Sequence, residues 1–150
     1  MSTSPSKQIE LPHPCTLEVR DACLCLHVQR AARALARRFD EAFRPLDLTN
    51  GQFSLLMSLN RPQPPSIGSV ASLLAMDRTT LTAALKPLVR RGLVTISVDK
   101  KDRRSRLLTI RPAGRALLAK AFPVWRQTHV ELERHISEPE RLRAALLALA

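Results

Sequence analysis

The densest group of chemically active side chains in this sequence is basic. Residues 78–111 contain ten Lys and Arg but only two acidic residues, a net charge of +8 in a chain whose formal net charge is +11. Such a cluster attracts polyanions, and neutralising phosphates with release of their counterions is the usual source of nucleic-acid affinity. The alternative is a solvated basic face without a partner, which many soluble proteins have.

Composition narrows the kind of polyanion. Aromatic residues make up 3% of the chain and Tyr is absent. Proteins that bind single-stranded nucleic acid, and most RNA-reading sheets, stack bases on aromatic side chains. The sequence therefore favours double-stranded DNA.

The cationic segment begins with a helix that Asp77 is placed to cap. The face predicted to be buried is apolar and carries Leu81, Ala84, Leu85 and Leu88. The opposite face is small, polar and basic and carries Thr79, Thr82, Lys86 and Arg90. An ordinary amphipathic surface helix would mix Glu with Lys there, yet residues 78–92 include no acidic residue. A helix that enters the major groove needs hydroxyl and cationic side chains, so we interpret this one as a recognition helix.

Two further helices are expected before it. The residues Thr49, Asn50 and Gly51 can cap one helix, which the RPQPP run at 61–65 ends. Ser66 can cap a second, short helix that ends at a turn formed by Ala75 and Met76. The short helix, the turn and the recognition helix together predict a helix-turn-helix.

A β-hairpin is expected after the recognition helix. Gly92 can end the helix, residues 94–98 alternate as a half-buried strand should, and residues 107–110 supply the returning strand. The loop at 99–106 between them carries the cations Lys100, Lys101, Arg103, Arg104 and Arg106. We expect Asp99 and Asp102 to order these arginines by charge-assisted hydrogen bonds, which would fix a guanidinium for insertion into the minor groove.

Long helices are predicted at both ends of the chain. One continuous helix is expected at 16–44, and Pro112 is placed to open another. Ser137 and Glu140 fit a capping box for a last helix, which is expected to bury Leu142, Leu146 and Leu149. Such helices on either side of a small DNA-binding unit suggest pairing between subunits. A symmetric dimer would set its recognition helices ~34 Å apart and require a pseudo-palindromic site.

The predicted fold class is mainly α with a small β-hairpin wing, that is, a winged helix-turn-helix with N- and C-terminal dimerisation helices. We assign residues 1–14 to a flexible arm, 15–48 to a dimerisation helix, 49–111 to the DNA-binding domain and 112–150 to C-terminal dimerisation helices. No apolar run approaches the ~20 residues that cross a bilayer, and no secretory signal is apparent. We expect a cytoplasmic protein without a membrane partner.

The run SVASLLAMDRTTLTAALKPLVRRGLVTISVDKKDRRSRLLTIRPAGR resembles the MarR (multiple antibiotic resistance regulator) family of winged helix-turn-helix repressors. Its specific features are RRGLV, then a D-x-x-DRR wing, then a glycine near the start of the next helix. Family members usually carry Leu-Thr before that helix, whereas here Ile110 is followed by Arg111, so the hydroxyl cap is missing.

The resemblance implies a homodimer joined through its terminal helices. On the recognition helix it implies DNA contacts by Arg78, Thr79, Thr80, Thr82 and Lys86. In the wing it implies that Asp102 orients Arg104, which enters the minor groove, with Lys101, Arg103 and Arg106 near phosphates. Family members commonly respond to phenolic or other aromatic acids, or to oxidants through a cysteine, and this sequence does not choose between the two.

The cysteines Cys15, Cys23 and Cys25 are the candidate redox sensors. A reactive thiol needs a depressed pKa, which Arg20, His27 or Arg30 could supply if they lie nearby. We favour the simpler interpretation that these cysteines are small buried hydrophobes. The region has no C-x-x-C pair or paired-His spacing, so neither a metal site nor a cofactor is expected.

Three classes of protein remain to be separated. The sequence favours a sequence-specific repressor, because hydroxyls on a recognition face add little to binding by charge alone. A nonspecific architectural protein would bind all duplexes with a strong salt dependence, and a thiol-dependent enzyme would turn over a peroxide or a disulfide. No nucleophile elbow or phosphate-binding glycine loop is present, so we do not expect an enzyme.

Overall fold

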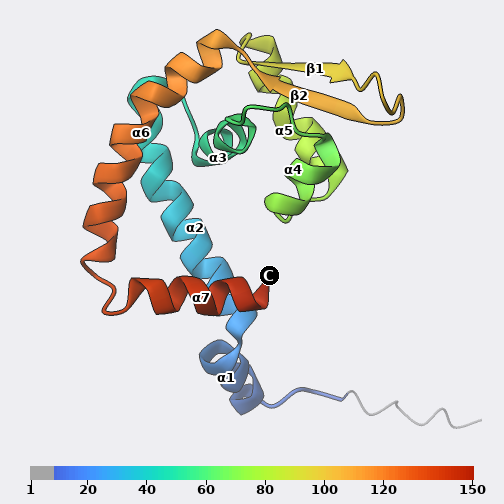
Figure 1. Cartoon of the computed structure of the whole chain (residues 1–150). Coiled ribbons are helices and arrows are strands. Elements are labelled where there is room, and N and C mark those ends of the chain that lie inside the picture. The colour runs from blue at the N-terminus through green and yellow to red at the C-terminus, as the bar shows by residue number, and fades with distance from the viewer. Residues whose placement is uncertain (1–8) are drawn as a thin grey trace, which may run out of the picture. The chain divides into compact units, whose positions relative to one another are not determined.

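Helices and one β-hairpin make up the fold in this computed structural model, which describes residues 9–150 (Figure 1). The elements in chain order are α1 (His13–Ala22), α2 (Leu24–Phe43), the 3-10 helix η1 (Arg44–Leu46), α3 (Asn50–Leu59), α4 (Ile67–Leu73), α5 (Arg78–Arg90), β1 (Val94–Val98), β2 (Arg106–Ile110), α6 (Pro112–Glu133) and α7 (Pro139–Leu149). The chain divides into two units, one up to Leu35 and one from Ala36 onward, which are described separately.

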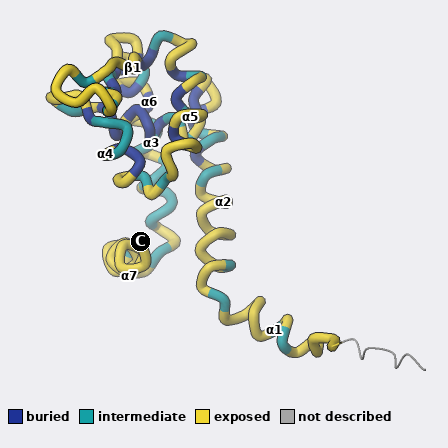
Figure 2. Tube along the Cα trace, turned by 90° about the vertical axis from the view of Figure 1, so that its right-hand side faces the viewer, coloured by how far each residue is buried: buried dark blue, intermediate teal, exposed yellow. Residues whose placement is uncertain are grey.

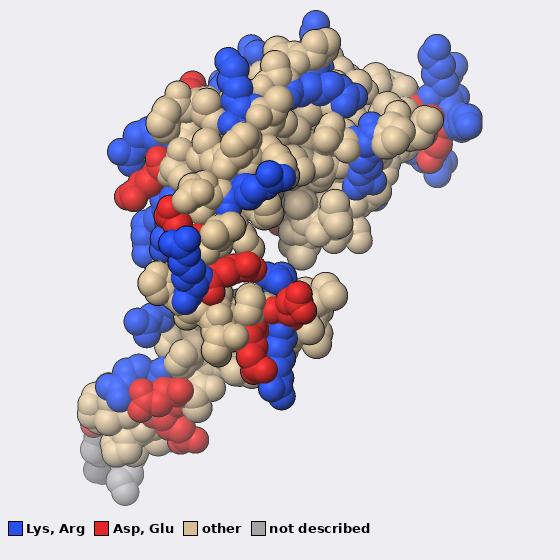
Figure 3. All heavy atoms as spheres, turned by 60° about the vertical axis from the view of Figure 1, so that its left-hand side comes forward, with Lys and Arg blue, Asp and Glu red and all other residues tan. Residues whose placement is uncertain are grey.

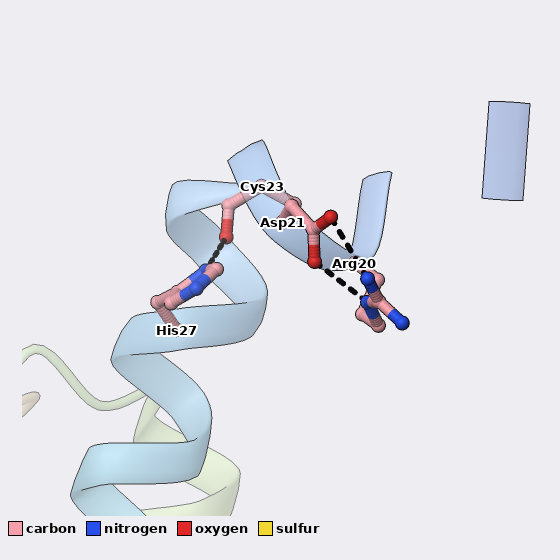
Figure 4. Close-up of polar contacts among 4 residues, drawn as sticks. All are labelled: Arg20, Asp21, Cys23 and His27. Carbon is pink, nitrogen blue, oxygen red and sulfur yellow. Dashed lines mark hydrogen bonds and ion pairs between the residues drawn. The ribbon is translucent and has the colours of Figure 1, made fainter. Parts of the chain in front are cut away.

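The single helix expected at 16–44 is wrong, because the structure has two helices that meet at Cys23. This residue adopts an extended conformation (φ −70°, ψ 106°). Its carbonyl accepts a hydrogen bond from His27 Nδ1 (2.8 Å; Figure 4). The same carbonyl accepts from the His27 amide (3.1 Å), and Cys23 Sγ accepts from the Leu26 amide (3.5 Å). The bond to Sγ satisfies the Leu26 amide, one of the donors that the start of a helix leaves unpaired. The first helix also begins earlier than expected, at His13, inside the arm assigned to 1–14; residues 1–8 of that arm lie outside the described residues.

The core of the second unit is built around aromatic residues and leucines. Phe43 is fully buried and stacks on Phe53, with ring centroids 4.8 Å apart. The predicted inner face of α5 is confirmed, since Leu81, Leu85 and Leu88 are fully buried. Because the leucines of α5 pack into this core, the opposite face of the helix is exposed to solvent.

The helix-turn-helix forms as the sequence predicts, because each cap is a local interaction. Ser66 Oγ accepts from the Ser69 amide (3.1 Å) at the start of α4, and Asp77 Oδ1 accepts from the Thr80 amide (2.7 Å) at the start of α5. Between the two helices Ala75 has φ +51°, the left-handed conformation that reverses the chain. Gly92 ends the second helix at φ +69°, a conformation that glycine adopts without strain.

The hairpin pairs β1 with β2 in an antiparallel register in which Val94 lies opposite Ile110 and Val98 opposite Arg106. The expected half-burial of β1 is only partly right. Val94 is buried, but Ile96 and Val98 are 40% and 48% exposed. The hairpin therefore extends past the core that covers its base.

The last two helices differ in how well they are covered. α6 begins at Pro112 without a side-chain cap, as the missing hydroxyl predicts, and packs against α3 and η1. The capping box predicted for α7 is wrong: its N-cap is Glu138, which makes no side-chain cap hydrogen bond. The predicted burial of Leu142, Leu146 and Leu149 is also wrong, because no residue of α7 is buried, and Figure 2 shows the helix exposed along its length.

Within residues 9–150, none of the helices combines the length and the apolarity that crossing a bilayer requires.

Candidate DNA-binding surface

The outer face of α5 is exposed, as predicted for a recognition helix. All six of its predicted site residues are open to solvent: Arg78, Thr79, Thr80, Thr82, Lys86 and Arg90. Two of the threonines also make hydrogen bonds within this segment: Thr80 Oγ1 donates to Asp77 Oδ2 (2.7 Å) and Thr82 Oγ1 donates to the Arg78 carbonyl (2.7 Å). The hydrogen bonds from Thr80 hold the pKa of Asp77 below its usual range, so this cap stays ionised.

The two aspartates of the wing loop accept hydrogen bonds from backbone amides of the loop. Asp99 Oδ1 accepts from the Lys101 amide (2.9 Å) and Asp102 Oδ1 from the Arg104 amide (3.1 Å). Each carboxylate therefore fixes the backbone of the loop. Asp102 positions Arg104 through its backbone amide and not through its guanidinium group. Arg106 closes the loop from the other side, because its Nη1 donates to the carbonyls of Arg103 (3.0 Å) and Ser105 (3.3 Å).

A hollow of about 350 Å³ lies between α4, α5 and the wing. The lining residues are Ser66, Ile67, Gly68, Arg78, Thr82, Asp102, Arg104, Ser105 and Arg106. Three of these are arginines and one is acidic, so the hollow is positively charged. Backbone pairing joins the start of α4 to the wing strand β2 at this hollow. The Leu108 amide donates to the Pro65 carbonyl (2.9 Å), and Ser66 forms an isolated antiparallel β-bridge with Leu107.

The structure thus gathers five of the predicted site residues around one hollow: Arg78, Thr82, Asp102, Arg104 and Arg106. Lys100 and Arg103 instead line a separate depression with Val98 and Asp99. The sequence did not predict the other four lining residues, Ser66, Ile67, Gly68 and Ser105. A serine cap was visible in the sequence, but its place beside the wing depends on pairing with a strand forty residues later.

Charge is distributed unevenly over the molecule. In Figure 3, Lys and Arg predominate at the projecting tip of the hairpin loop, while acidic side chains gather around α7 and the end of α6. The acids of that region include Glu131, Glu133, Glu138 and Glu140, several of which pair with arginines.

The cysteines are not the buried hydrophobes that we favoured from sequence. Cys15 and Cys23 are half-buried and Cys25 is exposed. The donors that reach sulfur are uncharged: the Leu26 amide at Cys23, and Gln29 Nε2 at Cys25 (3.1 Å). Arg20, one of the cations that could have activated a thiol, is instead paired through two nitrogens with Asp21, which raises the pKa of Arg20 and lowers that of Asp21 (Figure 4).

In the part of the chain that the structure describes, no three His, Cys, Asp or Glu residues gather closely enough to hold a metal ion.

Comparison with known proteins agrees with this geometry. The sequence profile of the MarR family matches residues 48–105, from just before α3 to the wing loop. The M. tuberculosis transcriptional regulator MosR, in a crystal structure of its complex with DNA, is 35% identical; the match covers 85% of this chain and 92% of that one, with a TM-score of 0.79. The chain belongs to the MarR family. The arrangement of α4, α5 and the hairpin is accordingly a MarR winged helix-turn-helix.

Two further proteins place this MarR-family chain among its relatives. The transcriptional repressor CouR, bound to a 23-mer DNA duplex, is 28% identical, with 94% of this chain and 96% of that one covered and a TM-score of 0.72. The transcriptional activatory protein BadR of Rhodopseudomonas palustris is 33% identical over 95 residues, which are 61% of this chain and 54% of BadR. The chain spans about half the length of curated relatives such as BadR.

Proposed function

We propose that this MarR-family chain forms a homodimer that binds a pseudo-palindromic site on double-stranded DNA and regulates transcription. The observation that carries the proposal is the basic hollow between α5 and the wing. In a duplex, one sugar-phosphate strand separates each major groove from the neighbouring minor groove. With α5 in the major groove and the wing loop in the minor groove, that strand runs across the hollow, where the arginines meet its phosphates.

The two elements have different tasks in this proposal. The face of α5 that carries Thr79, Thr82, Lys86 and Arg90 reads base edges and contacts the flanking phosphates. Arg104 enters the minor groove, where negative potential attracts a guanidinium. The remaining wing cations, Lys100, Lys101, Arg103 and Arg106, neutralise phosphates.

Uncovered apolar side chains support a homodimer. In the first unit, Val19 of α1 and Leu24 of α2 are 59% and 68% exposed; in the second unit, Leu147 and Leu149 of α7 are 77% and 64% exposed. Soluble monomers rarely leave contiguous apolar surface open, so we propose that the terminal helices of two copies cover one another. The dimer then presents two copies of α5 about one DNA turn apart, ~34 Å.

We propose that the bound state represses transcription and that a small aromatic acid or oxidation of a cysteine releases the DNA. The similarity to CouR, a transcriptional repressor, supports repression. The exposed thiol of Cys25 supports a redox trigger, because an oxidant can reach it. A panel of aromatic acids and a mild organic hydroperoxide, each added to the DNA complex of the wild type and of Cys25→Ser, separates the two triggers: only the redox route through Cys25 is lost in the variant.

The test of the proposed function starts from a random pool of duplexes, from which the protein selects its preferred site. The affinity for the selected duplex should exceed that for a scrambled one by at least ~10³. Arg104→Ala should weaken binding, whereas Lys120→Ala, which removes an exposed cation of α6 outside the hollow, should not. Equal binding to every duplex would identify a nonspecific architectural protein instead, and a monomer in sedimentation would contradict the dimer.

A further inference from the structure

Gly68, the second residue of α4, lies where another part of the chain approaches the helix closely. A Cβ at this position would be 2.9 Å from Nη2 of Arg78 and 3.7 Å from its Cζ. Real Cβ atoms almost never approach another heavy atom to less than 3.0 Å. A side chain at residue 68 would therefore require the Arg78 guanidinium to shift from its position.

The two atoms nearest to that Cβ belong to the end of the flexible Arg78 side chain, which can shift. The backbone of Arg78 is held in place, because Arg78 is the first residue of α5, directly after the Asp77 cap, and its carbonyl accepts from Thr82 Oγ1 (2.7 Å). The backbone just before Gly68 is held as well, because Ser66 forms a β-bridge with Leu107 of the wing strand β2. A Cβ at residue 68 would accordingly displace the guanidinium and leave both backbone segments in place.

We propose that Gly68 is a positioning residue: the absence of its side chain holds the Arg78 guanidinium in the hollow, where it binds a phosphate of the DNA backbone. This inference rests on the proposed function, because it needs DNA to bind across the hollow. Arg78 of α5 and Arg106 of the wing both line the hollow, so a phosphate bound there meets cations from both elements. A phosphate is favoured over a base edge, because the Arg78 guanidinium lies beside Gly68 of α4.

The size of the effect follows from counterion release. Affinity falls with salt concentration with a slope of about −0.9 on logarithmic axes for each phosphate neutralised. Loss of one such contact should therefore make the slope shallower by about 0.9 and weaken binding about fivefold at ~0.15 M salt and about fifteenfold at ~0.05 M. Because the contact is to the backbone, selected and scrambled duplexes should be affected alike.

The experiment compares Gly68→Ala, Arg78→Ala, the double variant and Gly51→Ala by titrating a labelled duplex over a range of salt concentrations. Gly51 is the matched control, since it is the second residue of α3 and a Cβ there would have nothing within 4 Å. Gly68→Ala should fold, because the displaced atoms end a flexible side chain and Ala favours a helix over Gly. Gly68→Ser adds the same Cβ and provides a second variant.

We expect both substitutions at Gly68 to weaken binding and to make the slope shallower, by no more than Arg78→Ala does, and the double variant to be no worse than Arg78→Ala alone. Gly51→Ala should bind as the wild type does. The inference is overturned if the Gly68 variants bind like Gly51→Ala, or if their loss adds in full to that of Arg78→Ala. A wild type that does not bind duplex DNA would instead overturn the proposed function, so the two failures are distinguishable.

Discussion

Gly114→Ala gives a test of the packing that supports the wing. Gly114 is the third residue of α6, and a Cβ there would lie 2.5 Å from the Leu93 carbonyl oxygen and 2.8 Å from Cγ1 of Ile110. That carbonyl cannot yield easily, because it belongs to the backbone and accepts from the Arg111 amide (2.9 Å). Reaching the shortest separation that real Cβ atoms show would move α6 away from the start of β1 by about 0.5 Å.

The expected cost combines two opposing effects. Overpacking of this kind costs about 1–3 kcal/mol. The better helix propensity of Ala offsets up to about 1 kcal/mol of this. We therefore expect the free energy of unfolding to fall by about 1–2 kcal/mol, and the melting temperature by about 2–8 °C for a chain of this length.

Urea unfolding followed by circular dichroism measures this change, at one fixed protein concentration because dimerisation would add to stability. Gly51→Ala is again the control, since the same change at an open position should leave the midpoint unchanged or slightly higher. A Gly114→Ala midpoint at or above that of Gly51→Ala would refute the close approach of α6 to the hairpin.

Three other predictions concern the DNA-binding unit and the thiols. Arg104→Ala should weaken binding to the selected duplex while the sedimentation coefficient of the free protein stays the same. Unchanged affinity in a mobility-shift titration would contradict the proposal that Arg104 enters the minor groove. Because hydrogen bonds from Thr80 lower the pKa of Asp77 in the folded state, the carboxylate contributes its full stability above its unfolded pKa of about 3.9 and loses it as the pH falls through the lower folded pKa. The difference in urea midpoint between wild type and Asp77→Ala should therefore shrink below pH ~4, and a difference independent of pH would contradict this. Replacing all three cysteines with Ser should leave DNA affinity unchanged in the absence of oxidant, since none of them lines the hollow, and a weaker complex would show that a thiol contributes to binding directly.

Local interactions explain what could be predicted from the sequence. Ser66 and Asp77 each accept from an amide three residues later, so the start of α4 and of α5 depends on neighbouring residues alone. The buried face of α5 follows from the helical spacing of its leucines. The helix-turn-helix and its exposed recognition face were therefore predictable.

The features that were predicted wrongly depend on distant parts of the chain or on a partner. Periodicity shows which face of a strand or helix is apolar but not whether anything covers it, so Ile96 of β1 and Leu146 of α7 were expected to be buried and are not. The break at Cys23 has no glycine or proline to mark it, and the extended conformation of that residue is not visible in the apolar pattern.

The glycines also differ in whether their roles could be predicted from the sequence. Gly92 could be placed because a helix end often needs a positive φ, which it has. The roles of Gly68 and Gly114 arise from close approaches to Arg78 and to the Leu93 carbonyl, which only the folded chain brings about. No local pattern distinguishes these glycines from Gly51, beside which nothing lies.

In the proposed complex, two copies of the chain place α5 in successive major grooves, with the wings in the minor grooves outside them. Hydroxyl-radical footprinting of the complex with the selected duplex tests this most directly. We predict protection symmetric about a dyad, with two strongly protected backbone segments centred about one helical turn apart and weaker protection of the flanking minor grooves. A single protected segment, or even protection along the whole duplex, would contradict it.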